Sequence, residues 1–274
     1  MLASSQRLRV LQRLPWLGDL PVSELAPLAG AFRERTLRRG AELVQPGEPP
    51  RHVHVVVEGK VEAAQAFPSP AIGLVEVLAR DGAGVSAVAE TDALVLELSA
   101  ADLYHALEDS FPLLLAVVRG LTRATLERGM PPVFRVGTHT PCNDCVDLVA
   151  RTLQLRRSAP AAVRLGEIHL ERGTELWREG DTSGYGVVVL SGEVMTNERG
   201  RDRIDRARPG ASLGMREALA GLPRWHDAVA VADTVLLRAD ADAMLDVLED
   251  QAELAGDMAH AIARGLLGAH RKAA

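Results

Sequence analysis

An internal repeat constrains the fold of this chain more than any other feature. Residues 214–237 read GMREALAGLPRWHDAVAVADTVLL and match residues 73–96, GLVEVLARDGAGVSAVAETDALVL, over equal length without a gap. A second pair of segments, 40–61 and 173–194, shares Gly, Glu, Leu, Val and Gly positions. The second copy carries extra residues between its two segments, around 197–208, which is typical of a hairpin loop. The sequence therefore predicts two copies of one domain.

The composition is typical of a soluble globular protein with two domains of ordinary size. The chain has 274 residues, of which 47% are hydrophobic and 25% charged, enough for two cores. No apolar run approaches the roughly 18 residues that span a bilayer, and the N-terminus lacks the pattern of a secretory signal. A net charge of −6 and only 3% aromatic residues do not favour nucleic-acid binding. The two cysteines do not favour a disulfide framework. We expect a cytoplasmic protein that enters no membrane and binds no DNA.

Apolar spacing and breaker residues place the elements and the domain boundaries. Helical spacing in residues 6–14 and 23–32 gives way to short β-branched runs with Gly and Pro between them, which are typical of antiparallel strands. The predicted domains are 1–135, a linker with a helix at 136–160, and 161–274. A helix is expected over about 240–270, where Leu254, Met258 and Ile262 recur every fourth residue. This stripe favours packing on its own domain, with a homodimer through the C-terminal helices as the alternative.

The motifs of the second copy resemble a known family. They are Gly173, Gly180-Asp181, residues 187–192, Pro209-Gly210, Gly214, Pro223-Arg224 and Val229-Ala230. Their order resembles the cyclic nucleotide-binding domain of the catabolite activator family and of protein kinase A regulatory subunits. The resemblance implies a mainly β fold with flanking helices: two tandem double-stranded β-helix domains (jelly-roll or β-roll), each followed by C-terminal helices. It also implies a phosphate-binding cassette in each domain.

The cassette of the second copy keeps part of the pattern that the resemblance implies. A cyclic phosphate needs backbone N–H groups and an arginine, and Arg224 stands at the arginine position. Met215 replaces the family's ribose-binding glutamate, and Trp225-His226-Asp227 replaces small residues. The candidate ligand-binding residues are Gly214, Met215, Glu217, Ala218, Leu219, Pro223, Arg224, Trp225, His226 and Asp227.

The first copy has lost both key residues of the cassette. Leu74 follows its cassette glycine and Ala83 stands at the arginine position. A buried phosphate without a cation is costly, so we expect no conventional nucleotide site there. Glu76 persists in this copy at the position of Glu217, which indicates a structural role for both, such as capping the cassette helix.

These features predict a non-enzymatic regulatory or interaction protein that binds a protein partner and has no cofactor. A cyclic nucleotide or a related ligand would act through the second copy. The alternative is a ligand-free pair of pseudo-domains that docks a protein partner. The DNA-binding family members append a winged helix-turn-helix, and no such segment precedes Ala274 in this sequence.

Three further clusters suggest other chemistry. His139, Cys142 and Cys145 form an H-x-x-C-x-x-C string in the linker that could hold zinc or act as a redox site, although a helix start is favoured. His52, His54 and Glu58 resemble the first metal motif of the cupins, an enzyme alternative; strand alternation turns the neighbouring valines inward and leaves the histidines in solvent. A solvated hairpin is the favoured interpretation of the remaining cluster, Arg199, Arg201, Arg203, Arg206 and Arg208.

Overall fold

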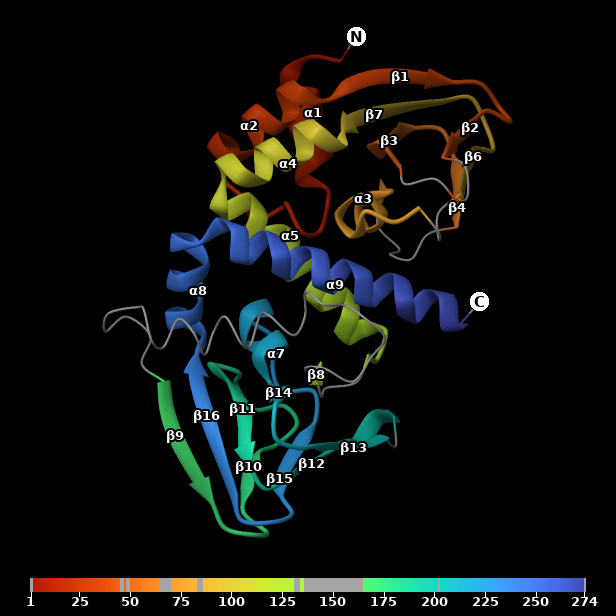
Figure 1. Ribbon diagram of the computed structural model, residues 1–274. Coiled ribbons are helices and arrows are strands. Elements are labelled where there is room, and N and C mark those ends of the chain that lie inside the picture. The colour runs from red at the N-terminus through yellow and green to blue at the C-terminus, as the bar shows by residue number, and fades with distance from the viewer. Residues whose placement is uncertain are drawn as a thin grey trace. The chain divides into compact units, whose positions relative to one another are not determined.

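The computed structural model describes residues 2–44, 47, 50–64, 70–82, 86–130, 134–135, 165–201 and 203–273. Its contacts divide the chain into two compact units (Figure 1). Unit 1 comprises Met1–Leu121 and Ala255–Ala274, and unit 2 comprises Thr122–Leu254. Among the described helices, none is long and apolar enough to cross a bilayer.

Unit 1 is a roll of two antiparallel sheets with helices at its ends. One sheet has the order β1-β7-β3-β5 and the other has the order β2-β6-β4. The elements are α1 (Ser4–Gln12), α2 (Val22–Ala31), β1 (Arg33–Leu37), β2 (Glu42–Val44), β3 (His52–Glu58), β4 (Val61–Ala64), β5 (Ala71–Ile72), α3 (Leu74–Ala79), β6 (Ser86–Ala89), β7 (Ala93–Ser99), α4 (Ala100–Asp109) and α5 (Phe111–Glu127).

Unit 2 repeats this plan with one added strand at the edge of each sheet. Its sheets have the orders β8-β14-β11-β16-β9 and β10-β15-β12-β13. The elements are β8 (Phe134–Arg135), β9 (Leu165–Leu170), β10 (Glu175–Trp177), β11 (Tyr185–Ser191), β12 (Val194–Glu198), the short 3-10 helix η1 (Arg199–Arg201), β13 (Arg203–Ala207), β14 (Ala211–Leu213), α7 (Met215–Ala220), β15 (Asp227–Ala230), β16 (Thr234–Asp240) and α8 (Ala241–Asp250). The last helix, α9 (Ala252–Ala273), begins in unit 2 and belongs to unit 1 from Ala255 onward.

Strand pairing is irregular at the same place in both units. The β3–β7 ladder has a bulge between Val56 and Glu58, and the β11–β16 ladder has one between Val189 and Ser191. Gly59 and Gly192 follow these bulges at positive φ, and a Cβ on either would overlap the backbone of the neighbouring strand. The predicted mainly β fold with flanking helices is confirmed, and the two pairs of sheets are consistent with two tandem domains.

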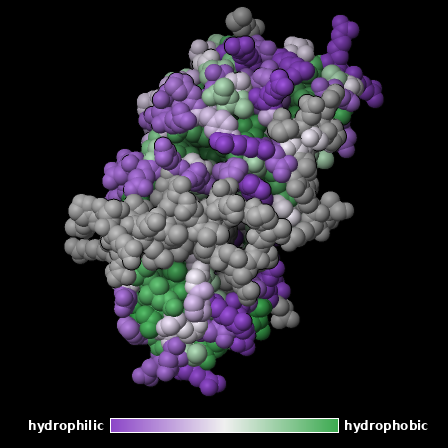
Figure 2. Space-filling model, viewed as in Figure 1, coloured by the Kyte–Doolittle hydropathy of each residue, from purple (hydrophilic) through white to green (hydrophobic). Residues whose placement is uncertain are grey.

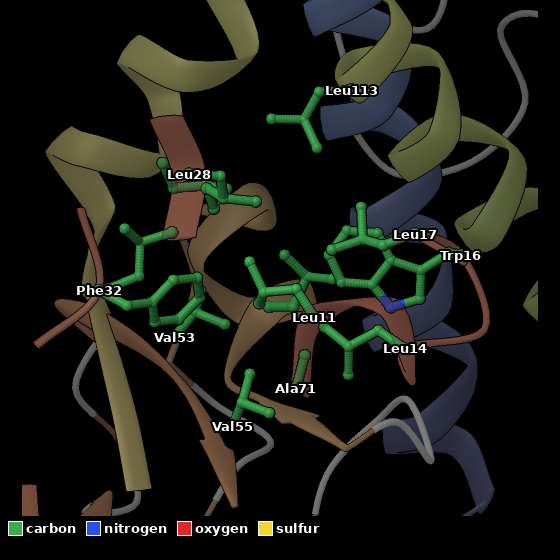
Figure 3. A pocket seen from close by; sticks show the side chains of 13 residues that line it. Leu11, Leu14, Trp16, Leu17, Leu28, Phe32, Val53, Val55, Ala71 and Leu113 are labelled. Atoms are coloured by element: carbon green, nitrogen blue, oxygen red, sulfur yellow. The ribbon is translucent and has the colours of Figure 1, made fainter. Parts of the chain in front are cut away.

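Each roll is filled by small and β-branched side chains. In unit 1 the core includes Leu43, Ile72, Ala87 and Val95, and in unit 2 it includes Trp177 and the strand residues packed around it. At the helical end of unit 1, side chains from α1, α2 and β3 converge on an apolar cavity of only about 10 Å³ (Figure 3). Hydrophilic residues cover most of unit 1 in the view of Figure 2, whereas on unit 2 hydrophobic residues gather over β16.

His54 corrects one expectation about β3. Strand alternation predicted that His52 and His54 face solvent, but the His54 side chain is only 3% exposed. Its Nε2 lies 3.2 Å from Oε2 of Glu97, its cross-strand neighbour on β7. Both faces of β3 are covered, since the consecutive residues Val53, His54 and Val55 are all buried, so alternation does not decide exposure there.

The last helix does not stay with the strands that precede it. The helix expected over 240–270 is two helices, α8 and α9, which meet at Gln251. From Ala255 onward α9 belongs to unit 1, where His260 Nδ1 lies 2.8 Å from the carbonyl oxygen of Leu78. The expectation that the last helix packs on the domain of its own copy is therefore wrong. The residues of α5 from Thr122 onward belong to unit 2.

Candidate functional site

The cassette of unit 2 is a short helix held between two glycines. Strand β14 ends at Leu213, Gly214 turns the chain at φ 73°, and Gly221 ends α7 at φ 64°. Both residues adopt the left-handed conformation that glycine accepts without steric cost. Gly214 has a second reason to lack a side chain, because a Cβ there would overlap Nη1 of Arg224.

Arg224 lies in the interior, where the chain itself satisfies its terminal nitrogens. Its side chain is 1% exposed. Nη1 donates to the carbonyl of Gly214 at 2.9 Å, and Nη2 donates to the carbonyl of Tyr185 at 2.5 Å. The guanidinium carbon lies 3.9 Å from the ring centroid of Trp177 and 4.8 Å from that of Tyr185. Cation–π contact and two hydrogen bonds therefore fix this arginine in place of a ligand.

Glu217 and His226 form a buried pair beside Arg224. Oε1 of Glu217 lies 3.3 Å from Nδ1 of His226, and both side chains are 1% exposed. The atoms are within ion-pair distance but lack hydrogen-bond alignment. Burial raises the pKa of Glu217, but the imidazole, the residue's own N–H and Arg216 together outweigh burial and hold this pKa below its usual value. Glu217 thus lies buried in the first turn of α7, beside His226.

The space next to this pair is almost filled. A cavity of about 10 Å³ remains, room for roughly one water molecule. It is lined by Leu126, Met130, Glu198, Arg201, Arg216, Glu217, Trp225 and His226. A ligand pocket typically occupies about 300–1,000 Å³, so the cassette in this state is occupied by side chains of the chain itself.

The arginine hairpin binds the end of α5. Arg201 donates to the carbonyls of Leu126 at 3.3 Å and Glu127 at 2.9 Å, and Arg203 donates to the carbonyl of Gly129. The expectation of a wholly solvated hairpin is wrong for these two residues. The last carbonyls of a helix lack partners within the helix and carry partial negative charge, which the guanidinium groups compensate.

The structure brings together some of the predicted site residues. Arg224 binds Gly214. Glu217 and His226 meet at the filled cavity, which the half-buried Trp225 also lines. Ala218 and Leu219 are buried on α7, and Met215 packs against Gly186 of β11. Pro223 is exposed. Asp227 lies apart, where it binds Arg199 at 2.7 Å and accepts from the backbone N–H of Glu179.

Sequence reasoning missed the aromatic partners of Arg224. Trp177 and Tyr185 come from β10 and β11, far from Arg224 in sequence. The repeat held a signal, because the first copy has Val44 and His52 at the equivalent positions. An aromatic pair that occurs only in the copy that keeps the arginine indicates a cation–π site.

The cassette of unit 1 has a similar backbone without the arginine. Gly73, at φ 85°, begins α3, and Arg80, at φ 53°, ends it. Glu76 is 1% exposed, as Glu217 is. Ala83, at the arginine position, lies outside the described residues.

Unit 2 has the strand order, the cassette and the arginine of a known family. Residues 167–251 match the family model of the cyclic nucleotide-binding domain. Unit 2 contains a cyclic nucleotide-binding domain. The match runs from β9 to the residue after α8, so it includes α7 and Arg224 of this cyclic nucleotide-binding domain.

Solved structures similar to this chain include regulatory proteins. The regulatory subunit of a cAMP-independent protein kinase A from Trypanosoma brucei is 15% identical, with 91% of this chain and 89% of that chain covered and a TM-score of 0.37. The corresponding subunit from Trypanosoma cruzi, bound to guanosine, is 11% identical, with 97% and 92% covered and a TM-score of 0.37.

A shorter match is the N-terminal domain of a transcriptional regulator from Streptomyces coelicolor. It is 21% identical, with 56% of this chain and 94% of that chain covered and a TM-score of 0.37. No curated protein matches the sequence. The fold therefore follows from the family model and from the sheets themselves.

The two metal hypotheses have different outcomes. His139, Cys142 and Cys145 lie outside the described residues, as does the whole linker at 136–160. In the described part of the chain, no three His, Cys, Asp or Glu side chains gather as a metal site. The cupin-like alternative therefore receives no support from His52, His54 and Glu58.

Proposed function

We propose that the chain is a non-enzymatic regulatory protein and that the cyclic nucleotide-binding domain of unit 2 is its switch. In the resting state described above, the cassette is occupied by the chain's own side chains. One observation carries this proposal: Arg224, the cation expected to hold a phosphate, is 1% exposed and donates to the carbonyls of Gly214 and Tyr185. A phosphate ligand competes with these carbonyls for the same donors.

The filled cavity adds a second cost to ligand binding. A cyclic nucleotide requires far more than about 10 Å³, so Trp225, His226 and the end of α5 must move before it enters. Met215 offers no carboxylate for a ribose hydroxyl. These features support weak binding that is coupled to a conformational change.

The end of α5 is the element that would transmit this change. Leu126 and Met130 line the cavity, and Arg201 and Arg203 hold the carbonyls beside them. A ligand that fills the cavity displaces this segment and shifts the population of its two arrangements. A protein partner that recognises one arrangement would sense the ligand. We further propose that the first sequence copy, residues 1–135, is a domain of the same kind without a phosphate site, and that the second sequence copy spans 161–274. The compact units differ from these copies in that unit 1 includes Ala255–Ala274 and unit 2 begins at Thr122.

The test is calorimetric titration of the full chain with cyclic AMP and then cyclic GMP. We compare the wild type with an opened double variant, Met215→Glu/Trp225→Ala, which restores a ribose acceptor and removes a side chain that lines the cavity. The opened variant should bind at least about tenfold more tightly, because the desolvation and displacement costs fall. Arg224→Ala in the opened background should abolish binding, whereas the exposed Arg206→Ala should not.

Other outcomes decide against this proposal. Tight wild-type binding that persists in Arg224→Ala would place the ligand elsewhere. No heat from either nucleotide in a folded opened variant would retire the sensing function and leave a ligand-free scaffold for a protein partner.

A further inference from the structure

We propose that unit 1 binds a small phosphorylated ligand, not in its cassette but in an open pocket between the start of β3, the end of α3 and the start of α4. The pocket has a volume of about 760 Å³, within the range typical of small-molecule sites, roughly 300–1,000 Å³. This proposal does not depend on the switch proposed for unit 2.

The lining of this pocket is basic. Arg51 precedes β3, His52 begins it, and Arg80 follows α3; all three line the same pocket. One carboxylate, that of Glu76, also lines the pocket, and its residue is 1% exposed. Nε2 of His52 lies 3.7 Å from Oε1 of Glu97. The guanidinium groups of two arginines are permanently charged and planar, and each can donate two hydrogen bonds to the oxygens of a phosphate group. The start of α4, at Ala100 and Ala101, forms the third side of the pocket; its first turn is capped by Ser99 and contains Asp102.

Arg80 adopts a backbone conformation that costs free energy. Among the residues that the structure describes, it is the single non-glycine residue at positive φ. Gly221, its counterpart in the repeat, has nearly the same φ of 64°. Strain of this kind persists where the side chain has a function. Here the guanidinium lies over the ring of Tyr104, 5.5 Å from its centroid, and the Tyr104 hydroxyl donates to the carbonyl of Val77 at 2.7 Å.

The second copy shows that building the roll does not require these cations. Arg51, His52, Arg80 and Tyr104 have as their counterparts Gly184, Tyr185, Gly221 and Leu245. No cation stands at any of these four positions of unit 2, although the strands and the short helix are paired alike. The basic residues are therefore additions to a common scaffold, and they all line the same pocket.

The test is calorimetric titration of the full chain with pyrophosphate, with AMP as a second probe. R80G introduces glycine, the residue that the second copy has at this position, Gly221. Glycine accepts the positive φ without strain, so the variant should keep the fold. It should weaken pyrophosphate binding about tenfold or more, since a charge-assisted hydrogen bond is lost. R39Q removes an exposed charge elsewhere in unit 1 and should change the affinity less than about twofold.

Two further arms identify the site and the ligand. R224A must leave pyrophosphate binding intact, which separates this pocket from the cassette of unit 2. Tighter binding of AMP than of pyrophosphate assigns the site to nucleotides, and the reverse assigns it to phosphate groups without a nucleoside. The proposal is overturned if pyrophosphate and AMP both fail to bind the wild type at millimolar concentration, or if R80G and R39Q weaken binding equally.

Discussion

At the scale of single residues, the buried pair of Glu217 and His226 makes unit 2 sensitive to acid. Glu217→Gln keeps the shape of the side chain but leaves the imidazole without its charged partner. We expect a loss of stability on the order of 3 kcal/mol at pH 7. Urea unfolding, followed by fluorescence of Trp177 and Trp225 in a Trp16→Phe background, measures this loss in unit 2. Glu171→Gln, an exposed acid of the same unit, serves as the control.

The pH dependence of that loss has a definite sign. The pKa of Glu217 is below its usual 4.5 in the folded protein, so the pair stabilises fully above pH 4.5 and the benefit disappears as the pH falls further. The difference between wild type and Glu217→Gln should therefore shrink below pH 4.5. A difference that stays constant down to pH 3 would contradict the assignment of the pair.

His54 makes the stability of unit 1 depend on pH in a different window. Burial lowers the pKa of His54 from 6.5 to about 4, against the opposing effect of Glu97. The unfolded chain therefore binds a proton that the folded chain excludes, and stability falls as the pH drops from 6.5 to about 4. The loss is on the order of 3 kcal/mol.

The test of this prediction is hydrogen exchange of β3 and β7 between pH 7 and pH 4.5, corrected for the intrinsic rates. His54→Val introduces the residue that the second copy has at this position, Val187, and should flatten the pH dependence. If the variant retains the full slope, another group is responsible.

Residue roles were predictable where they depend on neighbours in sequence and not where they depend on other strands. The repeat located the cassette at Gly214, and the resemblance to the cyclic nucleotide-binding family implied the role of Arg224 and the loss of the glutamate at Met215. It could not show that Arg224 bonds to two carbonyls, because Gly214 and Tyr185 approach it only when β11 and α7 pack together. The burial of His54 was missed for a similar reason, since the covering of both faces of β3 is a property of the whole sheet.

At the scale of elements, the end of α5 depends on the hairpin of η1 and β13. Arg201→Ala removes donors to the carbonyls of Leu126 and Glu127, so we expect the amides around 127–130 to exchange about tenfold faster. Hydrogen exchange with mass spectrometry resolves this segment. Arg206→Ala removes a contact with Glu193 in the same hairpin and should leave those amides unchanged; equal effects of the two variants would argue against the helix-end role of Arg201.

Among the elements, the strands and short turns were more predictable than the long helices. Glycine and β-branched runs marked the strands, and the inserted residues around 197–208 correspond to η1 and β13. The break between α8 and α9 at Gln251 was not predicted. The membership of α9 in unit 1 was not predictable, because an apolar stripe indicates that a helix packs against something but does not indicate against which element.

At the scale of the whole molecule, α9 should stabilise unit 1. Leu266 of α9 is fully buried and belongs to unit 1. Leu266→Ala should therefore lower the stability of β3 and β7 by about 2–5 kcal/mol, read from their hydrogen exchange, with a much smaller effect on β11 and β16. Leu213→Ala, also buried but in β14, should give the opposite pattern. If Leu266→Ala affects only the strands of unit 2, α9 belongs with its own copy.

The exchange of helix segments between the units has a consequence for the ancestry of the chain. A cut in the linker at 136–160 leaves the first piece without the residues from Ala255 onward, which belong to unit 1. It leaves the second piece without Thr122–Glu127, which belong to unit 2. Recombination that moved one copy alone into another gene would deliver an incomplete fold. Once this arrangement arose from a duplication, the two copies could diverge in sequence only as a pair inherited together.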